Sequence, residues 1–347
     1  MSARPLLREA GVDDERIIRD LLRAAYPDNP KVDPAIMRWQ YWDNPFGRTR
    51  AWIWELEGQA IAHWAAVPVP LVLDGQPVVG VKTADAATHP EHRRQGLFAE
   101  LAAAYMTELG RSNVPAVLTH PNPDSTPGVA ASGAQLVARV PAFVRALDDG
   151  WLAQRLHLPL PLARPLVSAA RRVAFRPSGN VGPDAIAVPS PPRDLDALWQ
   201  ATGGSYGVRR DSAWWEWRYV QRPAGEYRFA EVRRHGELVG AAALQVREAF
   251  GGRFGYVMEF MAADVEAAQQ LTAVIEGMAR AQAAVGLVLI ATPRSSAGVL
   301  AQRAGFRRLP QRLEPNPLRF LVAAPAGSSA ALAAQDWSIA WGDLDHV

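Results

Sequence analysis

The stretch TADAATHPEHRRQGLF, residues 83–98, decides the fold that we expect for this chain. An apolar run at residues 78–81 precedes it and predicts a strand. Helix-forming residues follow it, and apolar side chains recur there at positions 97, 98, 101, 105 and 109. The stretch therefore predicts a strand, a short basic loop and a helix in direct succession.

The loop itself has the composition of an anion site. The first N–H groups of a helix lack internal partners and carry a partial positive charge. Arg93 and Arg94 would bring further positive charge to that end, and Gly96 would let the backbone approach an anion closely. A phosphate or pyrophosphate is the ligand that this arrangement favours.

Residues 87–96, ATHPEHRRQG, resemble the coenzyme A loop of the GCN5-related N-acetyltransferases (GNAT), especially the V-A-T-x-P-x-x-R-x-x-G loop of Eis-type tandem acetyltransferases. Arg93 and Gly96 match the family motif Q/R-x-x-G-x-G/A, whereas Phe98 stands in place of its small final residue. The resemblance implies a mixed α/β (α+β) fold with two tandem GNAT-like domains. Each would be a twisted, mostly antiparallel sheet flanked by helices.

The same resemblance implies acetyl-CoA as the co-substrate. Asn122 and Ser125 match the P-N-x-x-S segment of the Eis-type branch. The residues that we expect at the cofactor are Ala86, Ala87, Thr88, Arg93, Arg94, Gln95, Gly96, Leu97, Phe98, Asn122 and Ser125.

Composition limits the other function classes. The chain has 347 residues, 49% of them hydrophobic, and a formal net charge of only +2, so no nucleic-acid partner is expected. It has no cysteine, which excludes disulfides, thiolate metal sites and a cysteine nucleophile. We expect no metal, no membrane association and a cytoplasmic location, while the oligomeric state is not indicated.

The second half of the sequence repeats the first. Trp39 and Tyr41 recur 178 positions later as Trp217 and Tyr219, and Gly133 recurs after 172 positions as Gly305. We therefore expect a first domain at 1–148, a linker at 149–185 with a short helix near 165–175, a second domain at 186–323 and a tail at 324–347.

The two copies differ at the basic loop. An ungapped alignment places Ala267 and Ala268 opposite the two arginines, and Gln270 opposite Gly96. The second loop would thus lack both the charge and the glycine. We expect the second domain to be degenerate and acetyl-CoA to bind only to the first.

Candidates for proton transfer are few. Asp85 lies in an apolar stretch and is the nearest candidate base, although a structural hydrogen bond explains it equally well. Val129 stands where many relatives carry the tyrosine that serves as general acid. In Eis-type relatives the terminal carboxylate enters the first active site, which implies Asp345 and the Val347 carboxylate as further candidates.

Aromatic residues suggest where the acceptor binds. Trp42 and Trp64 do not recur in the second copy, so we expect them, with Tyr26, to line a substrate pocket. The sequence thus predicts an acetyl-CoA-dependent N-acetyltransferase acting on a primary amine of a small molecule or peptide. Two alternatives stay open, namely a transferase that uses another acyl donor and a non-catalytic acyl-CoA sensor.

Overall fold

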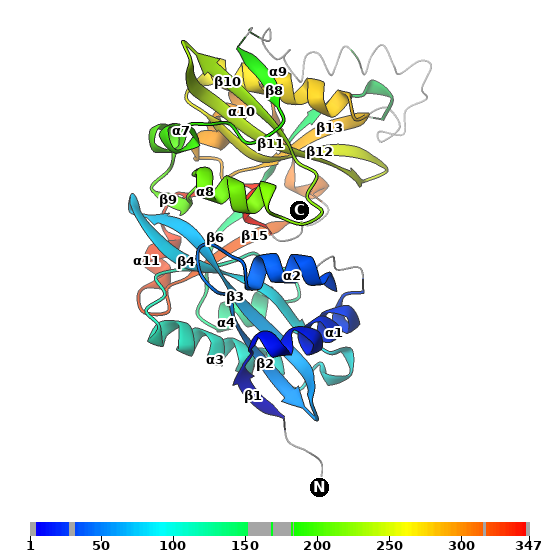
Figure 1. Cartoon of the computed structure of the whole chain (residues 1–347), viewed down its shortest axis with the longest axis vertical. Helices are drawn as coiled ribbons and strands as arrows, with labels where there is room; N and C mark the ends of the chain where they lie inside the picture. The colour runs from blue at the N-terminus through cyan, green and yellow to red at the C-terminus, as the bar shows by residue number, and fades with distance from the viewer. Residues whose placement is uncertain are drawn as a thin grey trace. The chain divides into compact units, whose positions relative to one another are not determined.

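The protein is described from a computed structural model, which covers residues 5–27, 32–151, 168, 182, 184–314 and 317–344 (Figure 1). The chain forms two compact units, neither of which is continuous in sequence. Unit 1 comprises Met1–Arg139, Gln221–Ala224 and Leu318–Gln335. Unit 2 comprises Val140–Val220, Gly225–Pro317 and Asp336–Val347.

Unit 1 contains a mixed sheet with helices on both faces. Its elements are β1 (Leu6–Glu9), η1 (Val12–Asp14), α1 (Glu15–Ala25), α2 (Pro34–Tyr41), β2 (Arg50–Leu56), β3 (Gln59–Leu73), β4 (Gln76–Thr88), η3 (Pro90–His92), α3 (Leu97–Arg111), β5 (Val117–Thr119), α4 (Thr126–Ala131), β6 (Gln135–Val140), β15 (Leu318–Ala323) and α11 (Ser329–Ala333). The strand order is β1-β2-β3-β4-β5-β15-β6. Only β4 and β5 are parallel among the strand pairs whose register is known.

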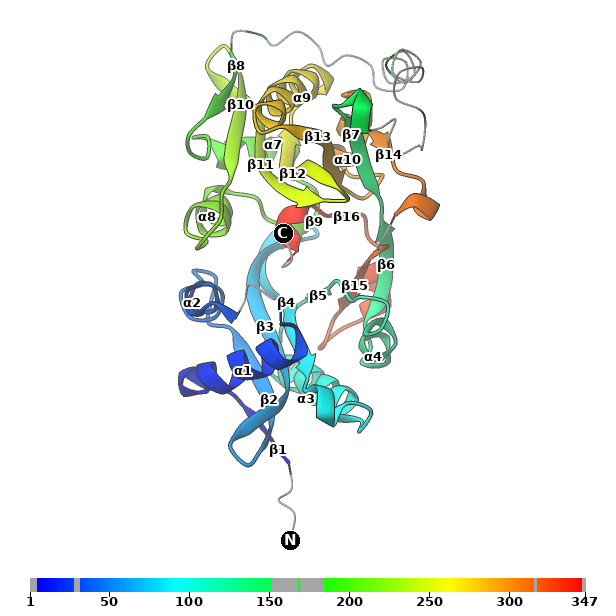
Figure 2. The same cartoon turned by 90° about the vertical axis from the view of Figure 1, so that its right-hand side faces the viewer.

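Successive side chains along each strand point to opposite faces of this sheet. Trp52 and Trp64 pair across β2 and β3 and belong to the core beneath α3, with Leu101 and Tyr105 of that helix. Residues one position away, such as Ile53, point to the face that α1 and α2 cover, and Ile18 of α1 is buried there. In Figure 2, α1 and α2 lie on one side of these strands and α3 on the other.

Unit 2 repeats this plan. Its elements are β7 (Ala142–Ala146), β8 (Ala185–Val188), α7 (Leu195–Thr202), β9 (Tyr206–Val208), α8 (Ser212–Trp215), the π-helical turn η4 (Glu216–Val220), β10 (Arg228–Arg234), β11 (Glu237–Ala249), β12 (Gly252–Ala262), α9 (Val265–Arg280), β13 (Ala284–Ile290), α10 (Ser296–Arg303), β14 (Arg307–Arg308), η5 (Gln311–Leu313), β16 (Trp337–Ser338) and η6 (Trp341–Asp343). The strand order is β8-β10-β11-β12-β13-β7-β14, again with one parallel pair, β12 and β13. The predicted fold class is confirmed.

The sixth position of each sheet holds a strand from the other half of the sequence. β15 pairs with β5 in unit 1, and β7 pairs with β13 and β14 in unit 2. Only Pro141 separates β6 from β7. A hairpin needs at least a two-residue loop, so β7 cannot fold back beside β6. The contiguous halves expected from the duplication therefore differ from the compact units in the positions of these two strands.

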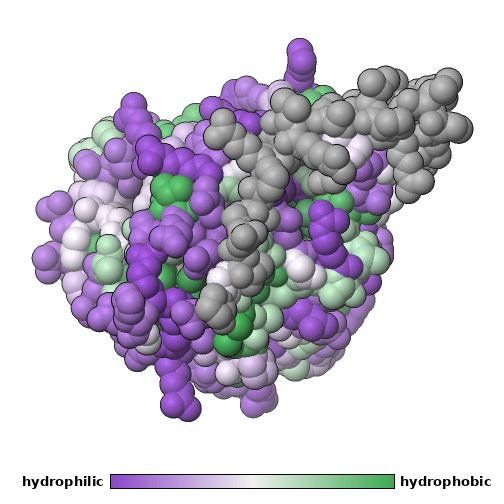
Figure 3. All heavy atoms as spheres, turned by 90° about the horizontal axis from the view of Figure 1, so that it is seen from above, coloured by the Kyte–Doolittle hydropathy of each residue, from purple (hydrophilic) through white to green (hydrophobic). Residues whose placement is uncertain are grey.

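Most of the expected linker, residues 152–167, 169–181 and 183, lies outside the described residues, as does most of the helix expected near 165–175. Within the described ranges, no helix is long and apolar enough to cross a membrane. The face in Figure 3 shows polar side chains around small, separate apolar spots.

Candidate active site of unit 1

The basic loop ends at an uncapped helix. Gly96 is the N-cap of α3, its φ is 82°, and no side chain accepts a hydrogen bond from the first turn. A Cβ at Gly96 would contact only the Glu100 carboxylate at 3.8 Å, so the space in front of it is open. Arg93, Arg94 and Gln95 are exposed. The N–H groups of α3 thus face an open, positively charged surface.

Strand β4 separates from its neighbour just before this loop. It pairs with β5 only at Val81 and Lys82, whereas its pairing with β3 continues to Thr88. Among the described residues, no strand pairs with residues 83–88 on the β5 side. This segment includes the predicted Ala86, Ala87 and Thr88. A strand edge of this kind can pair with an extended ligand through backbone hydrogen bonds.

A bulge in β4 aims Asp85 at α2. Two residues of β4, Asp85 and Ala86, lie opposite the single Trp64 of β3, and Asp85 has a left-handed φ of 53°. The Tyr41 hydroxyl donates to Asp85 Oδ2 at 2.8 Å, and His63 Nδ1 lies 2.8 Å from the Asp85 carbonyl oxygen. The expected structural hydrogen bond of Asp85 is thus present.

Tyr26, at the end of α1, lies beside the same strand. Its hydroxyl donates to the Ala86 carbonyl oxygen at 3.1 Å. Partial burial raises the pKa of the Tyr26 hydroxyl, while the Arg93 charge acts in the opposite direction and the Asp85 charge acts in the same direction as burial. Tyr26 therefore lies within the electrostatic influence of both Arg93 and Asp85.

The two predicted tryptophans lie apart from each other. Trp42 follows Tyr41 directly, packs edge to face on its ring at 5.9 Å and lies under the Arg48 guanidinium. Trp64 is buried in the core beneath α3, where it stacks on Phe98 at 4.9 Å and on Tyr105 at 5.0 Å. The structure brings Tyr26, Trp42 and Asp85 to the α1–α2 face, whereas Trp64 packs on the opposite face.

The remaining predicted cofactor residues have structural partners. Leu97 is buried. The Phe98 ring packs on α4 so closely that a Cβ at Gly128 would overlap it. Only the backbone groups of Leu97 and Phe98 therefore face the loop. The Asn122 side chain accepts hydrogen bonds from the Ser125 backbone and hydroxyl, which fixes the start of α4. Asp345 and Val347 lie outside the described residues.

The equivalent helix of unit 2 is capped by its own chain. Eight residues, 89–96, separate β4 from α3, but only 263–264 separate β12 from α9. Asp264 is the N-cap of α9, accepts from the Ala267 N–H and pairs with Arg234 at 2.8 Å. The ungapped alignment of Gln270 with Gly96 was therefore wrong, because the loop is shortened and Gln270 lies within α9.

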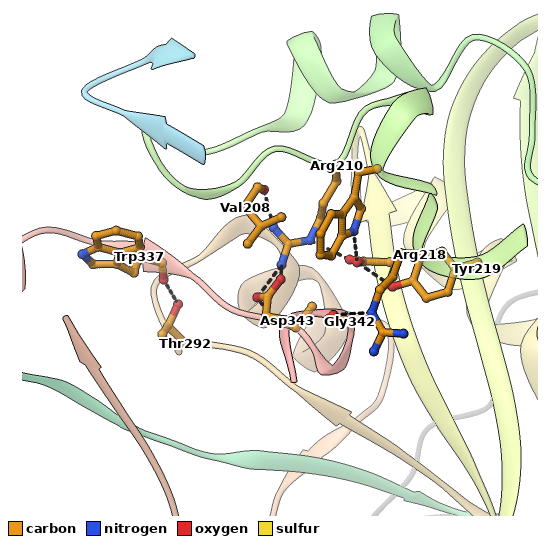
Figure 4. Close-up of polar contacts among 11 residues, drawn as sticks. Val208, Arg210, Arg218, Tyr219, Thr292, Trp337, Gly342 and Asp343 are labelled. Carbon is orange, nitrogen blue, oxygen red and sulfur yellow. Dashed lines mark hydrogen bonds and ion pairs between the residues drawn. The ribbon is translucent and has the colours of Figure 1, made fainter. Parts of the chain in front are cut away.

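Tyr41 and Asp85 also have counterparts in unit 2. The Tyr219 hydroxyl donates to Glu259 Oε1 at 2.7 Å, and Arg210 Nε donates to Glu259 Oε2 at 2.6 Å. Arg210 also binds both carboxylate oxygens of Asp343, and Arg218 donates to the carbonyl oxygens of Gly342 and Leu344 (Figure 4). The described end of the chain, as far as residue 344, therefore packs within unit 2.

Tyr41 is buried and was not among the predicted site residues, although it recurs in the second copy as Tyr219. This recurrence could have indicated a site residue, because both tyrosines donate a hydrogen bond to a carboxylate beside a strand bulge.

Among the described residues, no group of three His, Cys, Asp or Glu side chains could hold a metal ion.

Comparisons with known proteins agree with this geometry. Residues 7–130 match the acetyltransferase (GNAT) domain family. No curated protein matches the chain in sequence. Among solved structures, a probable N-acyltransferase from Enterococcus faecalis has a TM-score of 0.65 at 12% identity, over 93% of this chain and 73% of that one.

Two other solved structures are similar in fold. A GCN5-related N-acetyltransferase from Anabaena variabilis has a TM-score of 0.65 at 10% identity and covers 93% of this chain and 73% of its own. Eis1 from Mycobacterium abscessus has a TM-score of 0.60 at 13% identity, over 96% of this chain and 76% of its own. The match over residues 7–130 identifies a GNAT acetyltransferase domain in this part of the chain, and the three solved structures show that the fold is similar.

Proposed function

We propose that the chain is an acetyl-CoA-dependent N-acetyltransferase that acts on a primary amine of a small molecule or peptide, with its chemistry in unit 1. One contrast carries the proposal. Helix α3 starts behind a basic loop with no side-chain cap, whereas α9 is capped by Asp264. An external anion suits the first helix, and the second already has an internal one.

The residues of unit 1 fit coenzyme A. The N–H groups of the first turn of α3, with Arg93 and Arg94, would hold the pyrophosphate. The edge of β4 that faces away from β3, at residues 83–88, would pair with the pantetheine arm. When bound, acetyl-CoA supplies an activated acyl carbon and a thiolate leaving group.

The chain's own groups would handle the protons. An ammonium acceptor loses two protons as its nitrogen forms the C–N bond and the C–S bond breaks, and one of them neutralises the thiolate. Asp85, held by Tyr41, is the proposed acceptor of the other proton, which it returns to water. The carboxylates of Asp345 and Val347 remain proposals for the same step, based on the Eis-type resemblance.

Titration of acetyl-CoA into the full chain, followed by thiol release with a panel of amines, tests the proposal. We expect one binding site per chain and amine-dependent release of coenzyme A. Absence of binding, or two equivalent sites, would contradict it.

A coenzyme A sensor is the second candidate. Val129 is buried in the core and provides no hydroxyl where relatives carry the acidic tyrosine. Tight binding of acetyl-CoA without turnover of any amine would favour the sensor. A preference for a longer acyl chain in the same titration would instead indicate another donor.

A further inference from the structure

The last described residues of the chain, 337–344, form a segment that packs within unit 2. Its first part, β16, pairs with β9 as a parallel strand. The Thr292 hydroxyl donates to the Trp337 carbonyl oxygen, and the Trp337 side chain is buried. Peptides that bind to a strand edge are held in the same way, by backbone hydrogen bonds and by pockets for their side chains.

The second part of the segment, η6, lies where β12 separates from its neighbour. β12 pairs with β13 as far as Tyr256, whereas its pairing with β11 continues to Ala262. η6 packs against β12, and the Trp341 ring meets the Tyr256 ring edge to face at 5.3 Å. The segment therefore contacts the part of unit 2 that corresponds to residues 83–88 of β4, where unit 1 is proposed to bind its ligand.

Two buried arginines of unit 2 bind polar groups of the segment. Arg210 donates to the two carboxylate oxygens of Asp343, at 2.9 and 2.7 Å. Arg218 donates to the carbonyl oxygens of Gly342 and Leu344, at 2.9 Å each (Figure 4). A buried charge is stable only with a matched partner, so the site selects an acid at position 343.

Gly342 occupies a space with no room for a larger residue. A Cβ at position 342 would overlap the Tyr219 hydroxyl and the Glu259 carboxylate. These two groups are buried and joined by a hydrogen bond of 2.7 Å, and Arg210 binds the other oxygen of the same carboxylate at 2.6 Å. Movement of either group would break these bonds, so the site also selects glycine.

We propose that unit 2 is a peptide-binding unit whose ligand contains an aromatic residue, glycine and aspartate in succession, and that the chain fills this site with its own residues 337–344. The contacts go to backbone carbonyls, one carboxylate and a space of glycine size, and a separate peptide would present the same groups. The inference goes beyond the proposed function, because it assigns unit 2 a binding role of its own.

The covalent link that precedes the segment makes none of these contacts. A tether makes binding intramolecular and so raises the effective concentration of a ligand, which keeps even a weak site filled. If the segment is a ligand, it should therefore stay bound after the link is cut and exchange with free peptide.

A specific protease site inserted between Gln335 and Asp336 tests the inference on the whole folded chain. The Asp336 side chain is 73% exposed, so a protease can reach this point. After cleavage, we expect the circular dichroism spectrum to be unchanged and the segment to co-elute with the protein in gel filtration. A synthetic peptide of residues 336–344, with a fluorophore at its N-terminus and an amide at its C-terminus, should replace the segment and gain fluorescence anisotropy.

Variant peptides test which groups the site recognises. Asp343→Asn should bind about tenfold or more weakly, as expected for lost charge-assisted hydrogen bonds. Asp336→Asn makes the same chemical change at an exposed acid, 3.8 Å from Arg294, and should bind like the original peptide. Gly342→Ala should also bind about tenfold or more weakly, because its Cβ overlaps two fixed groups. Equal affinities of all four peptides would overturn the inference.

Three outcomes of the cleavage itself would also contradict the inference. Loss of the circular dichroism signal, or a bound segment that never exchanges with excess peptide, would make residues 337–344 a part of the fold of unit 2. A folded protein that loses the segment and binds no peptide would show that the covalent link alone holds it. Neither acetyl-CoA nor an amine is present in this experiment, so its result is independent of the transfer proposed for unit 1.

Discussion

Units 1 and 2 share one fold, but they differ at the N-terminus of the helix that follows the central strands and at the carboxylate bonded to a tyrosine. In unit 1, α3 begins with Gly96 and no side-chain cap, and Asp85 is only partly buried. In unit 2, Asp264 caps α9, and Arg210 binds the buried Glu259. Unit 2 thus satisfies its helix N-terminus and its buried carboxylate with side chains of its own. Helix α3 has no such side-chain cap, and an external anion is the partner that we propose for it.

The largest effect should come from separating the two halves of the sequence. A chain of residues 1–148 lacks β15, whose Phe320, Leu321 and Val322 are buried in unit 1. Each buried apolar side chain of this size contributes about 1.5–3 kcal/mol, and a domain has only about 5–15 kcal/mol in total. We expect this fragment to lack a cooperative thermal transition in circular dichroism.

A rescue fragment sharpens that test. Residues 1–140 joined by a flexible linker to residues 318–335 restore the strand order β5-β15-β6. This fragment should fold and bind acetyl-CoA. A stable 1–148 fragment would show that the exchanged strand is dispensable.

The next effect concerns the cation that unit 2 supplies for itself. Arg210→Met removes the guanidinium that pairs with the buried carboxylates of Glu259 and Asp343, and breaking a buried pair typically costs about 3–5 kcal/mol. Urea unfolding should show this loss. Arg234→Met, at an exposed pair, is the control and should change the midpoint little. Similar midpoints for both variants would mean that the network contributes no more than a surface pair.

Much of unit 1 could be predicted from its sequence because the signals are local. The apolar spacing after Gly96 predicted α3. Trp64 shows where the pattern was misjudged, since it shares the face of Trp52, whereas the adjacent His63 lies beside Asp85. Its cross-strand pairing with Trp52 places Trp64 in the core beneath α3.

The placement of β15 in unit 1 and of β7 in unit 2 could not be predicted in the same way. Strand pairing depends on contacts between residues that are distant in sequence. Pro141, alone between two strands, was the one local hint. The loop before α9 is shorter than the loop before α3, and an alignment without gaps could not show this difference. Asp264, in this shortened loop, caps α9.

A smaller effect is expected at the α3 N-terminus. Gly96→Glu adds a carboxylate where the pyrophosphate is proposed to bind, and each lost charge-assisted hydrogen bond removes about 1.5–3 kcal/mol of binding. Calorimetry should show a loss of acetyl-CoA affinity of about 100-fold or more. Gly96→Ala introduces the same backbone strain at φ 82° without the charge and should bind far better.

The matched change in unit 2 should leave acetyl-CoA binding intact. Asp264→Ala removes the cap of α9, which typically destabilises a protein by about 1 kcal/mol. If Asp264→Ala weakened acetyl-CoA binding as much as Gly96→Glu does, the assignment of the site to unit 1 would be wrong.

The smallest effect is the acid sensitivity that each unit owes to a paired carboxylate. A hydrogen bond from Arg8 lowers the pKa of Asp14 in unit 1, and one from Arg234 lowers the pKa of Asp264 in unit 2. A carboxylate with a lowered folded-state pKa stabilises the fold above its unfolded pKa, near 3.8, and loses that contribution as the pH falls through the folded value. The urea midpoint should therefore be level above about pH 5 and decline below it. Asp14→Asn should flatten more of this decline than Asp264→Asn, because the Asp14 side chain is 15% exposed and that of Asp264 is 43% exposed. If both variants kept the full decline, its cause would lie in other carboxylates.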